Sequence, residues 1–359
     1  MGSPDVLQID GLGGARLITS KMAIIRRSDR GDADVDYTFA QVNPARDQIV
    51  YTSNCGNISA GVGPFAIDAG LVSATQPVTV VRIHNTNTGK IVVAHVPVSG
   101  GRARVTGDFA IDGVPGTGAE IKMDYSGTVG AKTGRMLPTG QIIDSVLMED
   151  GSSVTVSVVD VANPCVFVHA DAFGLAATEL SEFFAGASAL LDRIRELRGK
   201  VAERIGIATD WRDVDRQSPS LPLFVAVASP SDYGTMRGTA VESCCIDLLA
   251  RLVWYDRCHE SMAGTGSMCT AAASRIPGSV VNQVIGAEAA ATGTLRIGHP
   301  MGVMAVSVQA APSNAEGGVA FGMLGFSRTA RRIMDGTVYV PRAALDVPRA
   351  RLDPLGAAV

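Results

Sequence analysis

The chain has 359 residues, of which 46% are hydrophobic and 18% charged, so it can bury a sizeable core, which we expect to be divided between two domains. Its net charge is −4 and its basic residues are dispersed, which argues against nucleic-acid binding. No apolar run approaches the ~20 residues of a membrane span, and the first residues lack a signal-peptide pattern, so we expect a cytoplasmic protein that binds no membrane.

Short β-branched runs separated by turn residues dominate the first third of the chain. The pair "VVRIHN" and "KIVVAHV", joined by residues 86–89, predicts a β-hairpin. A helix is predicted from about Gly56 to Gly70, because Ile58, Val62 and Phe65 recur at helical spacing and Gly70 is a typical stop.

The middle of the chain predicts a strand pair in "SVTVSVVDVANPCVFVHA", broken by Asn163 and Pro164. An amphipathic helix follows at residues 189–208. Residues 244–254 are interpreted as a second helix, and residues 264–279 as a third, which opens on glycine. The last third adds the strands "GTLRIGHPMGVMAVSVQA" and "GVAFGMLGFS".

The two glycine-led helices, at residues 56–70 and 264–279, share one design. Each is rich in small residues and opens on glycine and polar residues. This similarity suggests two half-molecules, each wrapping β-structure around a helix whose N-terminus faces a common cleft.

Six cysteines are present, and without a secretion signal in so long a chain we expect free thiols. They are Cys55, Cys165, Cys244, Cys245, Cys258 and Cys269. None forms a CxxC pair, and no His, Cys or carboxylate cluster has zinc spacing, so no metal site is predicted.

Cys55 lies in "SNCGN", directly ahead of the first glycine-led helix. The unpartnered N–H groups of a helix start stabilise a thiolate or a substrate carboxylate, so this thiol could give or take a proton. Asn54 and Asn57 offer amide hydrogen bonds to the same anion. The alternative is a buried structural cysteine, which the small and polar flanking residues make less attractive.

Lys21 follows Thr19 and Ser20 and precedes the apolar run "MAII". It is either a solvated lysine at a strand edge or a desolvated lysine suited to proton transfer. The upstream glycines could bind an anion, but their spacing matches neither nucleotide-binding fingerprint.

The segments "GSPDVLQIDGLGG", "TSKMAII", "NCGNISAGVGPFAI", "DGV" and "RTARRIMDGTVYV" together resemble the PrpF family of 2-methylaconitate isomerases and the related 4-oxalomesaconate tautomerases, nearly end to end. The resemblance implies an α+β, diaminopimelate epimerase-like fold with two similar domains and an active site between them. We expect the first domain at residues 1–113 plus 324–345, the second at 114–323, and a tail at 346–359.

The resemblance also implies a cofactor-independent proton shift on an unsaturated di- or tricarboxylate such as 2-methylaconitate, aconitate or 4-oxalomesaconate. Lys21 matches the family's active-site lysine and is our candidate for the principal base and acid. Cys55 matches the active-site cysteine and is the candidate for the second proton-transfer group or a substrate contact. A homodimer is one assembly that such a protein could form.

Further residues match segments that line the cleft in the family or the wider fold. The predicted substrate-binding residues are Ser20, Asn54, Gly56, Asn57, Asn163, His259, Gly266, Ser267 and His299. For His259, a purely structural role stays open. His299 is followed by Pro300 and Met301, where a small hydroxyl residue is usual, which leaves the substrate open.

Two alternatives to the isomerase remain. Family members begin with a segment that contains an Arg-Gly-Gly-Thr-Ser stretch, and without it we expect weak activity or a carboxylate-binding protein without turnover. Epimerisation at a single carbon needs two opposed acid and base groups, but Ser267 occupies the place of the epimerases' second cysteine.

Overall fold

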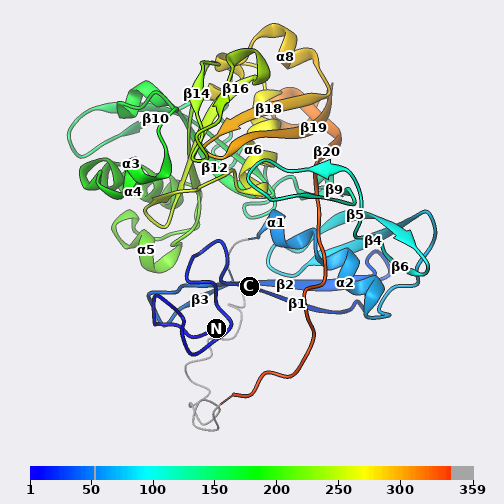
Figure 1. Cartoon of the computed structure of the whole chain (residues 1–359). Coiled ribbons are helices and arrows are strands. Elements are labelled where there is room, and N and C mark those ends of the chain that lie inside the picture. The colour runs from blue at the N-terminus through cyan, green and yellow to red at the C-terminus, as the bar shows by residue number, and fades with distance from the viewer. Residues whose placement is uncertain (52–53, 341–359) are drawn as a thin grey trace.

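The computed structural model describes residues 1–51 and 54–340. One long mixed sheet runs through both halves of the molecule, and each half wraps around a helix (Figure 1). Residues 341–345 of the predicted first domain and the predicted tail at 346–359 lie outside the described residues. Among the residues described, no helix is long and apolar enough to cross a membrane.

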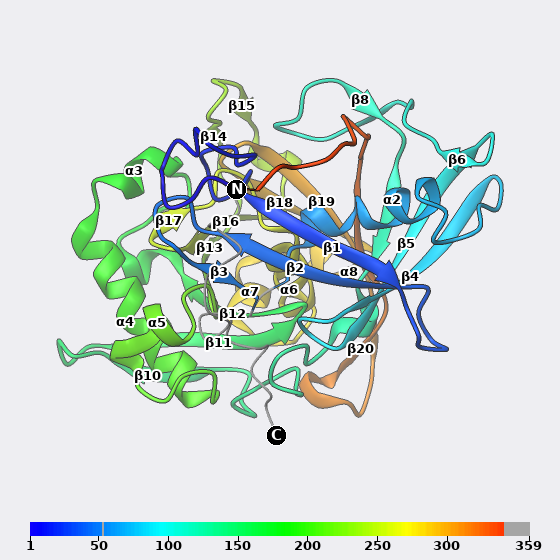
Figure 2. The ribbon, with the colours of Figure 1, turned by 90° about the horizontal axis from the view of Figure 1, so that it is seen from below.

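The first half of the sheet has the strand order β1-β2-β4-β5-β9, with β3 beside β2 and β6 beside β5. Its strands are β1 (Lys21–Arg27), β2 (Val35–Val42), β3 (Ile49–Val50), β4 (Val78–Asn85), β5 (Lys90–Ser99), β6 (Arg102–Ala103) and β9 (Ile121–Asp124), with a separate pair β7 (Phe109–Ala110) and β8 (Thr117–Gly118). Figure 2 shows β1 and β2 side by side. The predicted hairpin is confirmed as β4 and β5, and Gly89 supplies the positive φ of +68° that its turn requires.

The first glycine-led helix is shorter than predicted. The structure has two helices, α1 (Gly56–Ser59) and α2 (Val62–Asp68), in place of one from Gly56 to Gly70. Pro64 explains the interruption, because it has no N–H to donate to the carbonyl of Ala60 four residues earlier.

The second half of the sheet has the strand order β19-β18-β16-β13-β12-β11-β10. Its strands are β10 (Asp144–Leu147), β11 (Ser153–Val161), β12 (Asn163–His169), β13 (Leu223–Ala228), β16 (Leu248–Trp254), β17 (Arg257–Cys258), β18 (Thr294–His299) and β19 (Gly302–Pro312), with a separate pair β14 (Tyr233–Gly234) and β15 (Ala240–Val241). The predicted strand pair is confirmed as β11 and β12, but the break falls at Ala162, whose φ is +62°, and not at Asn163 and Pro164, which are the first residues of β12.

Helices cover both faces of this second half. They are α3 (Ser181–Ala185), α4 (Ser188–Arg204), α5 (Val214–Gln217), α6 (Gly264–Ser274), α7 (Val280–Val284) and α8 (Ala287–Ala291). Single 3₁₀ turns lie at Ser126–Thr128, Ala170–Phe173, Trp211–Asp213, Ser243–Cys245 and Glu316–Gly318. The predicted amphipathic helix is α4, which packs its apolar residues Ile194, Leu197 and Val201 on one face of the sheet. All eleven residues of α6 are buried on the other face.

The prediction of a helix at residues 244–254 is wrong. Apart from the short turn at Ser243–Cys245, this segment forms the strand β16. Its residues from Leu248 to Val253 are buried on both faces of the sheet, and a continuous apolar run of this kind has no periodicity that separates a strand from a helix.

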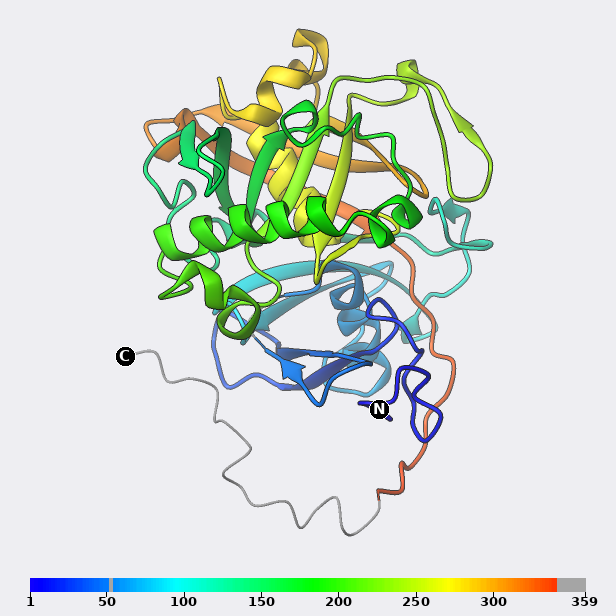
Figure 3. The same ribbon diagram turned by 90° about the vertical axis from the view of Figure 1, so that its left-hand side faces the viewer.

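The strand β20 (Val319–Arg328) joins the two halves. It pairs with β19 of the second half and with β9 of the first. Residues 329–340 form neither helix nor strand and run beside the first half (Figures 1 and 3).

Candidate active site

The two central helices meet at their N-termini, as the sequence predicts. A Cβ atom built on Gly56 would lie 3.0 Å from the backbone of Gly264 and Thr265, and one built on Gly264 would lie 3.1 Å from Gly56. Only glycine allows such a close approach of two backbones. The starts of α1 and α6 therefore form the floor of one cavity between the halves.

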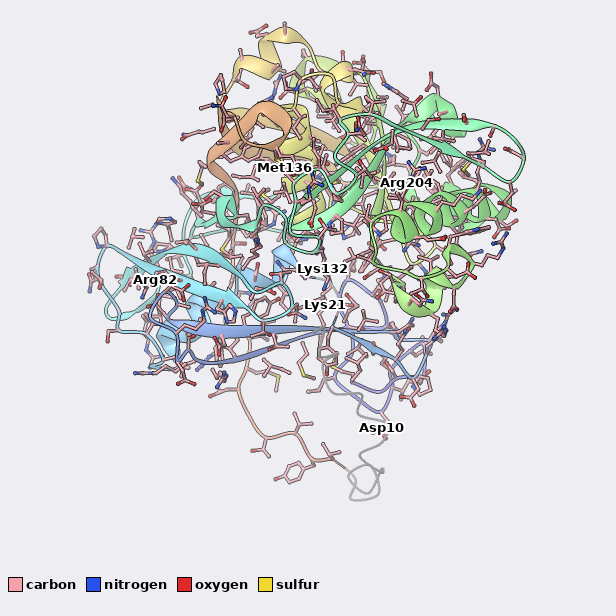
Figure 4. All side chains as sticks on the ribbon, turned by 180° about the vertical axis from the view of Figure 1, so that it is seen from behind. Asp10, Lys21, Arg82, Lys132, Met136 and Arg204 are labelled. Carbon is pink, nitrogen blue, oxygen red and sulfur yellow. The ribbon has the colours of Figure 1, made fainter. Side chains whose placement is uncertain are left out.

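Lys21 and Cys55 lie together in this cavity. The Lys21 ammonium, on the first residue of β1, is 3.4 Å from the Cys55 Sγ atom. Figure 4 shows Lys21 where the first strands face the rest of the molecule. The Lys21 Nζ atom also lies 5.7 Å from the centre of the Trp254 ring, at the end of β16. Two groups that can exchange a proton are thus in contact, 34 residues apart in the chain.

Cys55 occupies the N-cap position of α1. Because α1 has only four residues, its dipole is weaker than that of the long helix expected from the sequence. The nearby ammonium of Lys21 therefore contributes more to the positive field at the sulfur than α1 does.

The small cavity around this pair has a volume of about 30 Å³. Polar groups on its wall include Asn54, Asn57, Asn163, His259 and Thr265. No aspartate or glutamate lines it among the residues that the structure describes. An excess of hydrogen-bond donors over acidic groups suits an anionic ligand.

Asn54 and Asn163 tie the two halves together beneath the cavity. The Asn163 amide nitrogen donates to the Asn54 carbonyl and to the Thr265 hydroxyl, both at 3.0 Å, and its Oδ1 accepts from the Asn54 N–H at 3.3 Å. The Asn54 Oδ1 in turn accepts from Asn85 at 2.8 Å. With both N–H bonds of its amide engaged, Asn163 is placed to position the helix starts.

Three of the predicted substrate-binding residues point elsewhere. The Ser20 hydroxyl donates to Gln8 at 2.6 Å, and the Ser267 hydroxyl donates back to the Gly264 carbonyl at 2.8 Å. Gly266 faces the Leu252 side chain, which would lie 2.4 Å from an added Cβ. None of the three lines the cavity, because they are buried in their own half.

Both predicted histidines are buried at the cleft. The Nδ1 of His259 accepts from the Ser261 N–H, and the Nδ1 of His299 accepts from the Met301 N–H, each at 3.2 Å. Burial lowers the pKa of each imidazole to about 3, with Lys21 contributing at His259 and His259 contributing at His299. Both rings are therefore neutral near pH 7, and each keeps its proton on Nε2.

A larger cavity of about 670 Å³ adjoins the first at Asn57. Arg328, the last residue of β20, lines it, and its Nε donates to the Asn57 Oδ1 at 2.9 Å. Sequence reasoning missed Arg328 and Trp254. The only signal for Arg328 was its place in the segment "RTARRIMDGTVYV", and Trp254 was placed on the wrong element.

The six cysteines are free thiols. Cys269 is buried in α6 and donates to the Val159 carbonyl. In the part of the chain that the structure describes, no cluster of three or more His, Cys, Asp or Glu side chains has the geometry of a metal site.

Comparison with known proteins places these features in a family. The family model described as "PrpF protein" matches residues 1–341. The 3-methylitaconate isomerase of Eubacterium barkeri is 48% identical over 96% of this chain and 89% of its own length. The 4-oxalomesaconate tautomerase of Pseudomonas putida is 38% identical, over 95% of this chain and 87% of its own.

A solved structure shows the same fold. The crystal structure of a methylitaconate-delta-isomerase aligns with a TM-score of 0.80 and 47% identity, over 96% of this chain and 87% of that one. The predicted α+β, diaminopimelate epimerase-like fold is confirmed by this match and by the two helix-centred halves of the sheet.

Proposed function

The chain belongs to the PrpF family, and from this premise we propose that it is an isomerase that shifts a proton along an unsaturated di- or tricarboxylate. The contact of 3.4 Å between the Lys21 Nζ and the Cys55 Sγ carries the proposal. Its relatives are isomerases and tautomerases acting, by their names, on methylitaconate, methylaconitate and oxalomesaconate. We propose an acid of this class as the substrate.

The Lys21 and Cys55 pair can carry out the two proton transfers of a 1,3-shift. Proton transfer from the Lys21 ammonium to a Cys55 thiolate gives a neutral amine and a thiol. The amine takes a proton from the carbon next to a carboxylate, and the electron pair of the broken C–H bond moves toward the double bond. The Cys55 thiol then gives its proton to the far allylic carbon. Lys21 is left as an ammonium and Cys55 as a thiolate, and a proton transfer between these touching groups restores both.

The intermediate carries negative charge on the carboxylate that adjoins the reacting carbon. Preorganised donors stabilise such charge without reorganisation at the moment of reaction. The first-turn N–H groups of α6 and the amide of Asn57 lie at the cavity and supply these donors.

Single-carbon epimerisation is the weaker candidate. It needs a second acid or base opposite Cys55, and Ser267, which the resemblance to the epimerases puts in that role, is buried and bonded to its own helix. Carboxylate binding without turnover is separated from isomerisation by the experiment that follows.

The test is incubation in D2O with 3-methylitaconate, 2-methylaconitate, cis- or trans-aconitate, or 4-oxalomesaconate, followed by proton NMR. We expect isomerisation of at least one acid, reduced about 10²- to 10⁴-fold by Lys21→Ala or Cys55→Ser. The exposed Lys122→Ala and Cys244→Ser serve as matched controls and should keep full activity. Binding of these acids without deuterium uptake would favour the binding protein instead.

The location and the assembly remain proposals. Cys244 and Cys245 are adjacent, exposed and free, which suits the reducing cytoplasm that we propose. A homodimer is the proposed assembly, and light scattering on the purified protein checks it.

A further inference from the structure

Four donor groups converge where the small and the large cavities adjoin. They are Lys21, His259, His299 and Arg328. Three of them influence another member of the group electrostatically: in addition to burial, Lys21 and Arg328 lower the pKa of His259, and His259 and Arg328 lower that of His299. In the structure as described, neither Lys21 nor Arg328 forms an ion pair with a carboxylate. The cluster therefore has positive charge that nothing in the described chain neutralises.

Carboxylates on the wall of the large cavity are engaged elsewhere. Asp112 accepts from the Val303 N–H at 2.7 Å, and Glu120 accepts from the Ser327 hydroxyl at 2.7 Å. Glu260 forms an ion pair with Arg16 at 3.0 Å. None of these three carboxylates is within ion-pair distance of the Arg328 guanidinium.

Arg328 is held in place and still has donors to offer. Its Nε donates to Asn57, one N–H of Nη1 donates to the Ser327 carbonyl at 2.8 Å, and Nη2 contacts the Met304 sulfur at 3.2 Å. The guanidinium also stacks on the Phe326 ring, 4.3 Å from its centre. Of the five N–H bonds of a guanidinium, these contacts use three, which leaves one on each terminal nitrogen. Donors on two neighbouring nitrogens of a guanidinium can bind the two oxygens of a carboxylate.

The two histidines add neutral donors beside this charge. The backbone N–H groups of Ser261 and Met301 occupy the Nδ1 atoms of His259 and His299, so each Nε2–H is free to donate. A neutral imidazole next to an arginine can donate a hydrogen bond without electrostatic repulsion. A charged imidazolium would repel the arginine's guanidinium.

We propose that Arg328 anchors one carboxylate of the substrate, with the Nε2–H groups of His259 and His299 as its neutral partners. This inference rests on the proposed function and deepens it, since it requires a substrate with a carboxylate remote from the one next to the reacting carbon. The contact between Arg328 and Asn57, two residues after Cys55, then couples the anchored end to the reacting pair. The large cavity is also lined by Met262, Met301 and Met304, which would contact the part of the substrate beyond the anchored carboxylate.

Binding of a saturated diacid tests the anchor without any turnover. The probes are 2-methylsuccinate and its two monoamides, in which one carboxylate at a time becomes an uncharged group of the same shape. By calorimetry, the wild-type protein should bind the diacid about 10- to 100-fold more tightly than the monoamide that lacks the anchored carboxylate. Arg328→Gln should lose this factor for the diacid and bind the diacid and that monoamide equally.

Controls separate anchoring from folding. Arg328→Lys keeps the charge without the paired donors and should bind with intermediate affinity. Arg331→Gln removes an exposed arginine three residues away and should change nothing. An equal loss for the diacid and both monoamides in Arg328→Gln, or no loss, would overturn the anchor.

Measuring isomerisation then tests the Arg328 anchor separately from the proposed isomerase function. If the wild-type protein isomerises no acid but binds the diacid through Arg328, the anchor stands and the isomerase fails. If it isomerises a diacid while Arg328→Gln leaves KM and the preference for the diacid unchanged, the isomerase stands and the anchor fails.

Discussion

The two central helices occupy equivalent places in the two halves but differ in length and in chemistry. In the first half the helix is split into α1 and α2 and begins at a half-buried thiol. In the second half, α6 is continuous, wholly buried, and carries Ser267 bonded to its own backbone. Under the proposed function, the comparison teaches that two similar halves divide the work: the first carries the proposed reacting groups Lys21 and Cys55, and the second supplies a rigid wall and the neutral side chains of His259 and His299.

The largest expected effect comes from moving the thiol between the halves. The double variant Cys55→Ser with Ser267→Cys should be as inactive as Cys55→Ser alone, about 10²- to 10⁴-fold below wild type, because position 267 faces its own helix. The initial rate of isomerisation measures this. Recovery of activity in the double variant would show that the halves are interchangeable.

A smaller effect should follow from widening the contact between the helix starts. Gly264→Ala places a Cβ 2.8 Å from the Phe326 ring and 3.1 Å from Gly56, which should destabilise the protein by about 1–3 kcal/mol. Urea unfolding measures the change. Gly61→Ala, between α1 and α2, has room and a negative φ, so it should change stability by less than about 0.5 kcal/mol. Equal effects at both glycines would contradict the tight contact.

Acid should weaken the second half through its buried histidines. The pKa of His259 and of His299 is lowered to about 3 in the folded protein, whereas about 6.5 is usual in an unfolded chain. Between these values the unfolded chain binds more protons, so the free energy of unfolding should fall as pH drops below about 6.5, by up to about 1.4 kcal/mol per pH unit for each histidine. Urea titrations at pH 7, 6 and 5 measure the slope, and His299→Gln should make it shallower. An unchanged slope would mean that His299 is not buried in neutral form.

The smallest effect is expected for a contact between the halves at the surface. Arg16 and Glu260 pair at 3.0 Å, but 64% of the Arg16 side chain is exposed. Arg16→Ala should therefore cost less than about 1 kcal/mol in urea unfolding. A larger loss would indicate that the surface pair, and not the buried amides of Asn54 and Asn163, holds the halves together.

The sequence was most informative about the candidate site where its residues lie in short local motifs. The segments around Lys21 and Cys55 pointed to two side chains that the structure brings into contact, and the glycine-led starts predicted the convergence of two helices. It was less informative for β16, where burial on both faces erases periodicity. Pro64, visible in the sequence, could have predicted the interruption between α1 and α2.

Arg328 and Trp254 show what sequence patterns cannot supply. Arg328 reaches Asn57 across 271 positions of the chain, and Trp254 reaches Lys21 from a strand of the other half. Such contacts follow from topology, which places β20 against β9, and not from spacing.

The pairing of β20 with β9 also sets an order on biosynthesis. Residues 121–124 leave the ribosome about two hundred residues before their partners at 325–328. The edge of β9 that pairs with β20 therefore has no partner while the second half is being synthesised. Contacts this distant in sequence close late in folding. Arg328 ends the late strand, so a nascent chain contains Lys21 and Cys55 long before it contains the proposed carboxylate anchor.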